Sequence, residues 1–188
     1  MAQNLTVIKL ADAPGEHQAW TRPRTTIYAW AAIELLFVKN SWQISSKLRI
    51  WALRRFGASI GSGVTFRPGT RVKFPWNLTI GDDCWIGEGV WIHNQAPVNI
   101  EHDVVISQET MLTTGSHRHR VDMALITAPI RIEAGAWITS RCMVLGGVTV
   151  GQSALVTPMT VVSESVAPNT VVSGQHQVNV GQRFRSEQ

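Results

Sequence analysis

The stretch that decides the fold is residues 80–94, which read IGDDCWIGEGVWIHN. Within it Ile80, Ile86 and Ile92 are six residues apart, and Gly directly follows the first two. A period of six fits neither the 3.6-residue turn of an α-helix nor an unbroken alternating strand. It fits a strand of about four residues followed by a two-residue corner, with Gly at corners that need positive φ.

The same spacing continues on both sides of this stretch. Aliphatic or aromatic anchors form five sets of three: Ile60, Phe66 and Val72; Ile80, Ile86 and Ile92; Ile100, Ile106 and Leu112; Ile132, Ile138 and Val144; Val150, Val156 and Val162. Small residues favour the fourth place after an anchor, as at Thr70, Cys84, Ala96, Thr110, Ser116, Ala136, Cys142, Ala154 and Thr160. We expect both kinds of residue to point inward. Three sides per turn then predict an all-β solenoid, a parallel β-helix of about five three-sided coils over residues 60–167.

The gaps between sets are longer than six residues in three places, after Val72, Ile92 and Leu112. Each gap follows the third anchor of its set, so all three insertions should leave the solenoid at the same corner. The third, residues 118–131, is long for a loop without structure of its own, and such loops often carry function. We expect the chemistry there.

Composition limits the classes of partner. The chain has 188 residues, with 17 Lys and Arg against 13 Asp and Glu, spread along the sequence. This fits an anionic ligand, and we predict no nucleic-acid partner because the basic residues form no runs. Two cysteines without CxxC spacing favour a reducing compartment. No signal peptide is evident, and the apolar run 27–38 is shorter than the roughly 20 residues of a membrane span. We therefore expect a cytoplasmic protein.

Residues 1–59 lack the six-residue pattern and form an N-terminal extension. Residues 28–38 and 44–56 are predicted helices, and the second combines Arg49, Arg54 and Arg55 with apolar side chains. We favour a cap over the open end of the solenoid, whose first coil would otherwise expose strand edges. Peripheral contact with an anionic membrane at its inner face stays open as an alternative. Residues 168–188 are predicted to be a C-terminal tail.

Three segments, residues 80–94, 113–130 and 135–174, carry a resemblance to the hexapeptide-repeat acyltransferases. The chain most resembles colanic-acid-type polysaccharide O-acetyltransferases and their maltose, nodulation-factor and antibiotic acetyltransferase relatives. The resemblance covers about two thirds of the chain. It implies a left-handed β-helix, where the usual crossover rule would favour the other hand. It also implies a homotrimer with acetyl-CoA as co-substrate and no metal.

The resemblance implies that His117, at the head of the long insertion, is the general base. A neutral imidazole can take the proton of an attacking hydroxyl near neutral pH. Asn94 lies where relatives carry Asn or Asp near the acetyl group, so it is a second catalytic candidate; capping a turn is an equal alternative. The substrate-binding candidates are Ser116, Arg118, His119 and Arg120. The two arginines either bind a CoA phosphate or an anionic sugar, or are solvated.

In the family the pantetheine arm of CoA follows the later coils between two subunits. The matching cofactor-binding candidates in this chain are Ala136, Trp137, Thr139, Ser140, Thr157, Ser163 and, in the tail, Arg183. Ser163-Glu164 stands where relatives often have Thr-Lys, which removes a cation useful for phosphate.

The tryptophans suggest an exterior surface. Trp85 and Trp137 each precede an anchor, so they should point outward. Equivalent places on successive coils hold Thr65, Trp85, Val105, Trp137 and Leu155, which would form one apolar stripe. We expect it to be a subunit interface or the dock for the N-terminal helix, and a platform on which a sugar stacks is a further alternative.

Four functions remain open. The first is acetyl transfer from acetyl-CoA to a sugar hydroxyl in bacterial polysaccharide or glycoconjugate biosynthesis, with a carbohydrate as the acceptor. An amino-sugar or antibiotic acceptor is an alternative within that class. A zinc lyase of the γ-carbonic-anhydrase kind would use histidines among His93, His102, His117 and His119. A non-catalytic scaffold is the fourth.

Overall fold

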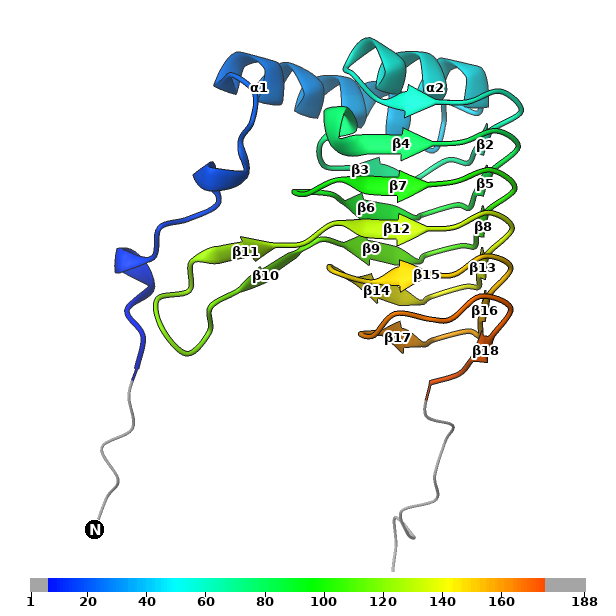
Figure 1. Cartoon of the computed structure of the whole chain (residues 1–188). Coiled ribbons are helices and arrows are strands. Elements are labelled where there is room, and N and C mark those ends of the chain that lie inside the picture. Colours follow the sequence, from blue (N-terminus) through cyan, green and yellow to red (C-terminus); the bar gives the residue numbers. More distant parts are fainter. Residues whose placement is uncertain (1–6, 175–188) are drawn as a thin grey trace, which may run out of the picture.

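The computed structural model describes residues 7–174, which form a three-sided parallel β-helix with helices across one end (Figure 1). Sheet 1 contains β1 (Ser59–Ile60), β4 (Leu78–Ile80), β7 (Val98–Ile100), β12 (Ile130–Ile132) and β15 (Thr149–Val150). Sheet 2 contains β2 (Thr65–Phe66), β5 (Trp85–Ile86), β8 (Val105–Ile106), β13 (Trp137–Ile138), β16 (Leu155–Val156) and β18 (Val171–Val172). Sheet 3 contains β3 (Arg71–Val72), β6 (Trp91–His93), β9 (Met111–Thr113), β14 (Met143–Leu145) and β17 (Val161–Val162).

The predicted anchors stack in register and fill the interior. In sheet 1, for example, Ile80 pairs with Ile60 on one side and Ile100 on the other. All fifteen anchors are buried. The small residues are buried as predicted except Ser116, which is exposed; Thr114 occupies the interior instead. The Thr114 hydroxyl accepts a hydrogen bond from Ala96 N (2.9 Å) and donates one to His93 O (3.2 Å), so the interior position is satisfied.

The solenoid has five complete coils and the start of a sixth. Val166 forms a parallel bridge with Val150, and β18 pairs with β16. The sixth coil therefore extends into residues 168–172, which were expected to be tail. The pattern did not reveal it because Val166 follows Val162 by four residues rather than six.

Helices close the first coil. They are α1 (Arg24–Ile33), a π-helix (Glu34–Val38) and α2 (Ser46–Arg55). Short 3-10 turns lie elsewhere, before α1 at Leu10–Asp12 and His17–Ala19 and between β3 and β4 at Pro75–Asn77. Trp30 Nε1 donates to Val72 O (2.9 Å), while Glu34 Oε1 accepts from Val72 N (2.7 Å). Ser46 Oγ accepts from Phe66 N (2.8 Å). The helices thus satisfy backbone groups that the first coil would leave unpaired, which is the capping role favoured above.

The apolar stripe is present on the outside of sheet 2. Thr65, Trp85, Val105, Trp137 and Leu155 are paired residue by residue along it. Trp85 and Trp137 remain 62% and 49% exposed. The helices lie across the end of the solenoid, where α2 contacts β2, and they leave Trp85 and Trp137 exposed, so the described helices do not dock on these tryptophans (Figure 1).

Candidate active site

The third insertion forms an antiparallel β-hairpin that leaves the corner between sheets 3 and 1 (Figure 1). Its strands are β10 (Gly115–His117) and β11 (Leu125–Thr127), with Ser116 opposite Ile126 and His117 opposite Leu125. The boundaries 118–131 expected for this loop are therefore wrong at both ends. The hairpin begins at Gly115, and residues 130–131 already belong to β12.

Contacts within its tip hold the hairpin in shape. Arg118 N donates to Ala124 O (2.9 Å), and the Arg118 guanidinium forms an ion pair with Asp122. Asp122 Oδ1 also accepts from Ala124 N (2.9 Å). That backbone hydrogen bond, together with Arg118, lowers the pKa of Asp122. Arg118 is thus engaged within the hairpin, whereas His119 and Arg120 are exposed at its tip.

His117 has a fixed tautomer. Its Nδ1 lies 2.8 Å from the backbone oxygen of Met123, which has a left-handed backbone conformation (φ 59°). A carbonyl oxygen can only accept, so Nδ1 carries the hydrogen and Nε2 keeps a free lone pair in the neutral ring. The imidazole is exposed. It can therefore remove a proton from a molecule bound beside the hairpin.

A groove of about 320 Å³ runs between the hairpin and the later coils. It is lined by Thr114, Gly115, Ser116, Ile126, Thr127, Ala128, Leu145, Gly146 and Ser163. A Cβ on Gly146 would lie 2.8 Å from Thr114 O, so only Gly allows the backbones to approach this closely. Apolar walls with a few hydroxyl groups suit a ligand arm of alternating alkyl and amide groups.

The groove and the imidazole lie on opposite faces of the hairpin. Successive residues of a strand point to opposite sides, so Ser116 and Ile126 share the groove face while His117 and Leu125 share the other. The His117 face is the one near Gln95, whose Oε1 would meet a Cβ on Gly115 at 2.2 Å. Within one chain, a ligand in the groove is therefore separated from Nε2 by the thickness of the hairpin.

Asn94 is fully buried away from solvent. Its Oδ1 accepts from Phe74 N (2.9 Å), and its Nδ2 donates to Phe74 O (2.6 Å). Both polar atoms of the amide are thus used by the backbone one coil above. This is the turn-capping alternative, and the geometry gives the side chain no free group for a substrate.

Most of the candidates for CoA binding lie elsewhere. Ala136 is fully buried, and Trp137 Nε1 donates to Ser107 Oγ (3.0 Å) on the outside of sheet 2. Thr139 donates to Val156 O (2.7 Å). Three of the candidates, Thr139, Ser140 and Thr157, occupy the corner between sheets 2 and 3. Only Ser163 lines the groove, and Arg183 lies outside the described residues.

Sequence reasoning missed Leu145 and Gly146 in the groove. A signal was available: Leu145-Gly146-Gly147 follows the third anchor of its set, at the corner where earlier coils carry insertions. Sequence alone could not show that the hairpin packs above this corner.

The histidines do not converge on a metal. Within residues 7–174 no group of three or more His, Cys, Asp or Glu side chains is placed to hold a metal ion. His102 bonds Asp103 (2.8 Å), which raises its pKa, whereas burial lowers the pKa of His93. His102 lies between sheets 1 and 2, away from the hairpin that carries His117. The arrangement offers no support for a zinc lyase.

Sequence comparison with known proteins identifies the family of this chain, although no family model matches it. It is 34% identical over 171 residues to the "Putative colanic acid biosynthesis acetyltransferase WcaF" of Escherichia coli K12, covering 90% of this chain and 88% of that protein. It is 25% identical over 126 residues to the galactoside O-acetyltransferase of the same organism, covering 65% and 62%.

Solved structures agree. A hexapeptide-repeat-containing acetyltransferase of Vibrio cholerae O1 biovar eltor, crystallised with acetyl coenzyme A, superposes with a TM-score of 0.72 at 27% identity. The match covers 80% of this chain and 82% of that one. A galactoside acetyltransferase in complex with coenzyme A, at 19% identity and a TM-score of 0.69, shares the fold over 93% and 91% of the two chains. The left-handed β-helix that the sequence implied is thereby confirmed, and the chain belongs to the hexapeptide-repeat acetyltransferases.

Proposed function

We propose that this protein transfers the acetyl group of acetyl-CoA to a hydroxyl of a carbohydrate, with His117 as the general base. The observation that carries the proposal is the hydrogen bond from His117 Nδ1 to Met123 O, which puts the hydrogen of the neutral ring on Nδ1 and leaves the Nε2 lone pair available on an exposed hairpin. Its similarity to a colanic acid acetyltransferase favours a role in bacterial polysaccharide or glycoconjugate biosynthesis.

The reaction needs one base and one donor of hydrogen bonds. Nε2 of His117 takes the proton of the acceptor hydroxyl while its oxygen attacks the thioester carbonyl carbon. Backbone or hydroxyl donors beside the site stabilise the resulting oxyanion. The tetrahedral intermediate then collapses, the C–S bond breaks, and the imidazolium returns the proton to the CoA thiolate. The products are an acetyl ester and free CoA thiol.

The groove is the proposed channel for the pantetheine arm, with Ser116 and Ser163 supplying hydroxyl groups to its amides. Of the cofactor-binding candidates from the sequence, only Ser163 is kept in this role. We assign His119 and Arg120, which are exposed at the tip of the hairpin, to contact with the acceptor or a phosphate. Arg118 acts instead by holding the hairpin through Asp122.

A homotrimer would resolve the separation between groove and base. Because His117 faces away from the groove of its own chain, the thioester that it serves is best supplied by the groove of a neighbouring subunit. The exposed stripe with Trp85 and Trp137 is an apolar surface suited to such a subunit contact. Each active site would then lie between two subunits.

A panel of acceptors tests the proposal. Purified protein is mixed with acetyl-CoA and hexoses, oligosaccharides or amino-sugars, and thiol release is followed together with the mass of the acceptor. We expect thiol release coupled to the gain of one acetyl group that mild alkali removes, as an ester requires. An alkali-stable product with amino-sugars only would favour the nitrogen acceptors, and no turnover with any acceptor would favour the scaffold.

A further inference from the structure

The helical cap has an outer surface that no other described part of the chain covers. Its inner faces bury Trp30, Val38, Ile50 and Leu53 against the first coil. The opposite faces of α1, the π-helix and α2, with the loop 39–45 between them, therefore point away from the solenoid (Figure 1). We refer to these outer faces and this loop as the cap surface.

The cap surface carries large apolar side chains in water. Trp42 is 92% exposed and Ile44 is 84% exposed, both on the loop. The adjoining helices add Tyr28, Leu35, Leu36 and Trp51, each more than half exposed. Apolar groups gathered in this way usually mark a contact with a protein or a membrane.

The loop is held in this shape from beneath. Arg49 is fully buried, and its guanidinium donates to Val38 O (3.1 Å), Asn40 O (3.1 Å) and Gln43 O. Asn40 Oδ1 in turn accepts from Trp42 N (2.8 Å). These bonds fix the loop backbone, so the exposure of Trp42 and Ile44 is a feature of the packed cap.

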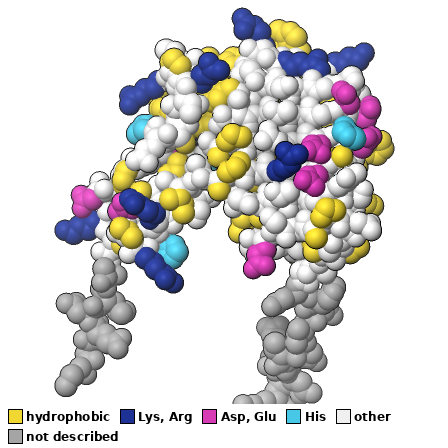
Figure 2. Space-filling view, viewed as in Figure 1, with side chains coloured by type: hydrophobic (Ala, Val, Ile, Leu, Met, Phe, Trp, Pro, Cys, Tyr) yellow, Lys and Arg dark blue, Asp and Glu magenta, His cyan; other side chains and the backbone are white. Residues whose placement is uncertain are grey.

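The surroundings of these apolar groups are basic. Residues 20–56 contain seven Lys and Arg but only one acidic residue, Glu34, whose carboxylate is turned inward to Val72 N. On α2, Lys47 and Arg55 lie one turn before and one turn after Trp51. Figure 2 shows Lys and Arg side chains along the helical end of the molecule with hydrophobic side chains among them.

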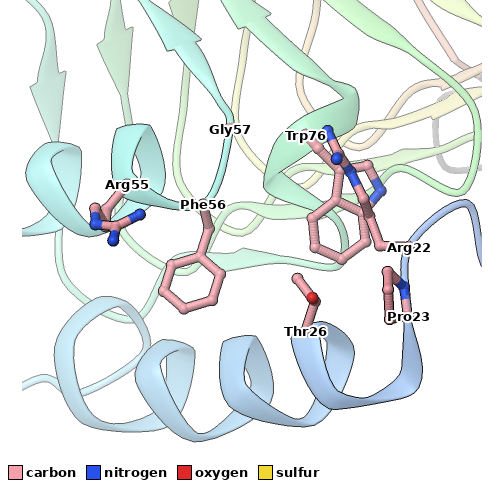
Figure 3. Close-up of a pocket in the computed structure, with 7 residues that line it drawn as sticks. All are labelled: Arg22, Pro23, Thr26, Arg55, Phe56, Gly57 and Trp76. Carbon is pink, nitrogen blue, oxygen red and sulfur yellow. The ribbon is translucent and has the colours of Figure 1, made fainter.

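Two hollows in the cap are lined by cations. One, of about 630 Å³, lies between α1 and the end of α2, with Arg22 and Arg55 at its two ends and Phe56 between them (Figure 3). The other lies between α2 and residues 61–65 of the first coil, with Lys47 and Arg55 in its lining; Arg54 also lines it but donates to Ile60 O. Hollows of this kind suit phosphate groups beside apolar chains.

We infer that the cap surface docks on an anionic lipid bilayer. Trp42 and Ile44 enter the interfacial layer, and the surrounding Lys and Arg side chains contact the headgroup phosphates. Within residues 7–174 no helix is long and apolar enough to cross a membrane. This surface differs from the one expected from sequence, because Ile50 and Leu53 of the second helix are buried against the solenoid and Arg49 is buried beneath the loop. The inference does not depend on acetyl transfer.

Vesicle flotation of the full-length protein tests it. We compare vesicles of phosphatidylcholine alone with vesicles containing 30% phosphatidylglycerol (a fraction of roughly this size gives a strong negative surface potential), at low and high salt. Wild type should float with the anionic vesicles only, and high salt should release it. Trp42→Ser/Ile44→Ser and, separately, Lys39→Gln/Lys47→Gln should each lower partitioning about tenfold or more.

Matched controls are Leu10→Ser and Lys9→Gln, which remove an apolar group and a charge outside the cap surface and should bind as wild type does. The four cap side chains are exposed, so the variants should fold, and circular dichroism with sedimentation checks this. Failure of wild type to bind anionic vesicles at low salt would overturn the inference. So would a smaller oligomer in Trp42→Ser/Ile44→Ser, because the surface would then be a contact between protein chains.

Discussion

His117 Nδ1 donates to the backbone oxygen of Met123 at 2.8 Å, so the imidazole that we propose as the base is oriented by the tip of the hairpin that carries it. The hairpin is a local structure, closed by contacts among residues 115–127. The orientation of the His117 imidazole therefore depends on the tip of the hairpin, and substitutions in the hairpin can test this.

Replacing His117 with Ala should lower the rate of CoA release about 10²–10⁴-fold, which is the usual contribution of a general base. His119→Ala, two residues further along, is the matched control: an acceptor contact affects KM, so its kcat at saturating acceptor should stay within about threefold of wild type. Thiol release at saturating acetyl-CoA measures both. Equal rates for wild type and His117→Ala would show that His117 is not the base.

Mixed trimers test whether each active site lies between two subunits. His117→Ala and Ser163→Trp, which fills the groove from an exposed position, should each be inactive alone. In a random mixture of the two, about a quarter of the sites would combine an intact base with an intact neighbouring groove. Recovery to about a quarter of wild-type activity after refolding them together supports a shared site. No recovery, with trimers of both chains present, would place groove and base in the same subunit.

Asp122 should matter for the shape of the hairpin rather than for chemistry. Asp122→Ala removes the acceptor of Ala124 N and the partner of Arg118, and we expect kcat to fall about tenfold with fold stability nearly unchanged. The lowered pKa of Asp122 means that its stabilising contribution is present above the ordinary pKa of an aspartate. It is lost as the pH falls through the lowered, folded-state pKa.

Hydrogen exchange of the Ala124 amide is the corresponding measurement. Protection should persist at neutral pH, decrease only in acid and be absent in Asp122→Ala. Asp122→Asn, which keeps the acceptor but loses the charge, should show intermediate protection. Full protection in Asp122→Ala would contradict this account.

Asn94 should be a stability residue. Asn94→Ala leaves the buried N–H of Phe74 without a partner and removes one of the two hydrogen bonds to its C=O, which Asn77 N still bonds (3.0 Å), and we expect the free energy of unfolding to fall by about 2–4 kcal/mol. Asn99→Ala, an exposed amide on β7, should change it by less than about 0.5 kcal/mol. Urea unfolding measures both. A large loss of kcat in folded Asn94→Ala, with unchanged stability, would instead support a catalytic role.

Glu34 gives the cap a dependence on pH. Burial raises the pKa of its carboxyl, although the hydrogen bond from Val72 N opposes this. The folded state therefore binds this proton more readily than the unfolded state, and the resulting stabilisation is complete below the ordinary pKa of a glutamate. It is lost as the pH rises through the raised, folded-state pKa. Glu34→Gln keeps an acceptor for Val72 N and should remove this dependence from urea unfolding measured between about pH 4 and 8.

The solenoid could be predicted because its determinants repeat locally. Ile80, Ile86 and Ile92 each meet the same requirement, an apolar side chain pointing inward once per six residues. The outward stripe with Trp85 and Trp137 followed from the same alternation. The position of His117 beside the long insertion came from the resemblance, and the structure adds its tautomer.

The features that only the tertiary structure decided depend on contacts between residues that are far apart in the chain. Asn94 is buried because Phe74, one coil away, uses its amide, and the groove exists because the hairpin packs above Gly146. The sixth coil begins at Val166, four residues after Val162, so a search for apolar residues at six-residue spacing does not find it. Sequence by itself thus determined which side chains point inward, since strand alternation is local. Which polar groups remain free for chemistry was decided by long-range packing, because hydrogen-bond partners are set by the fold.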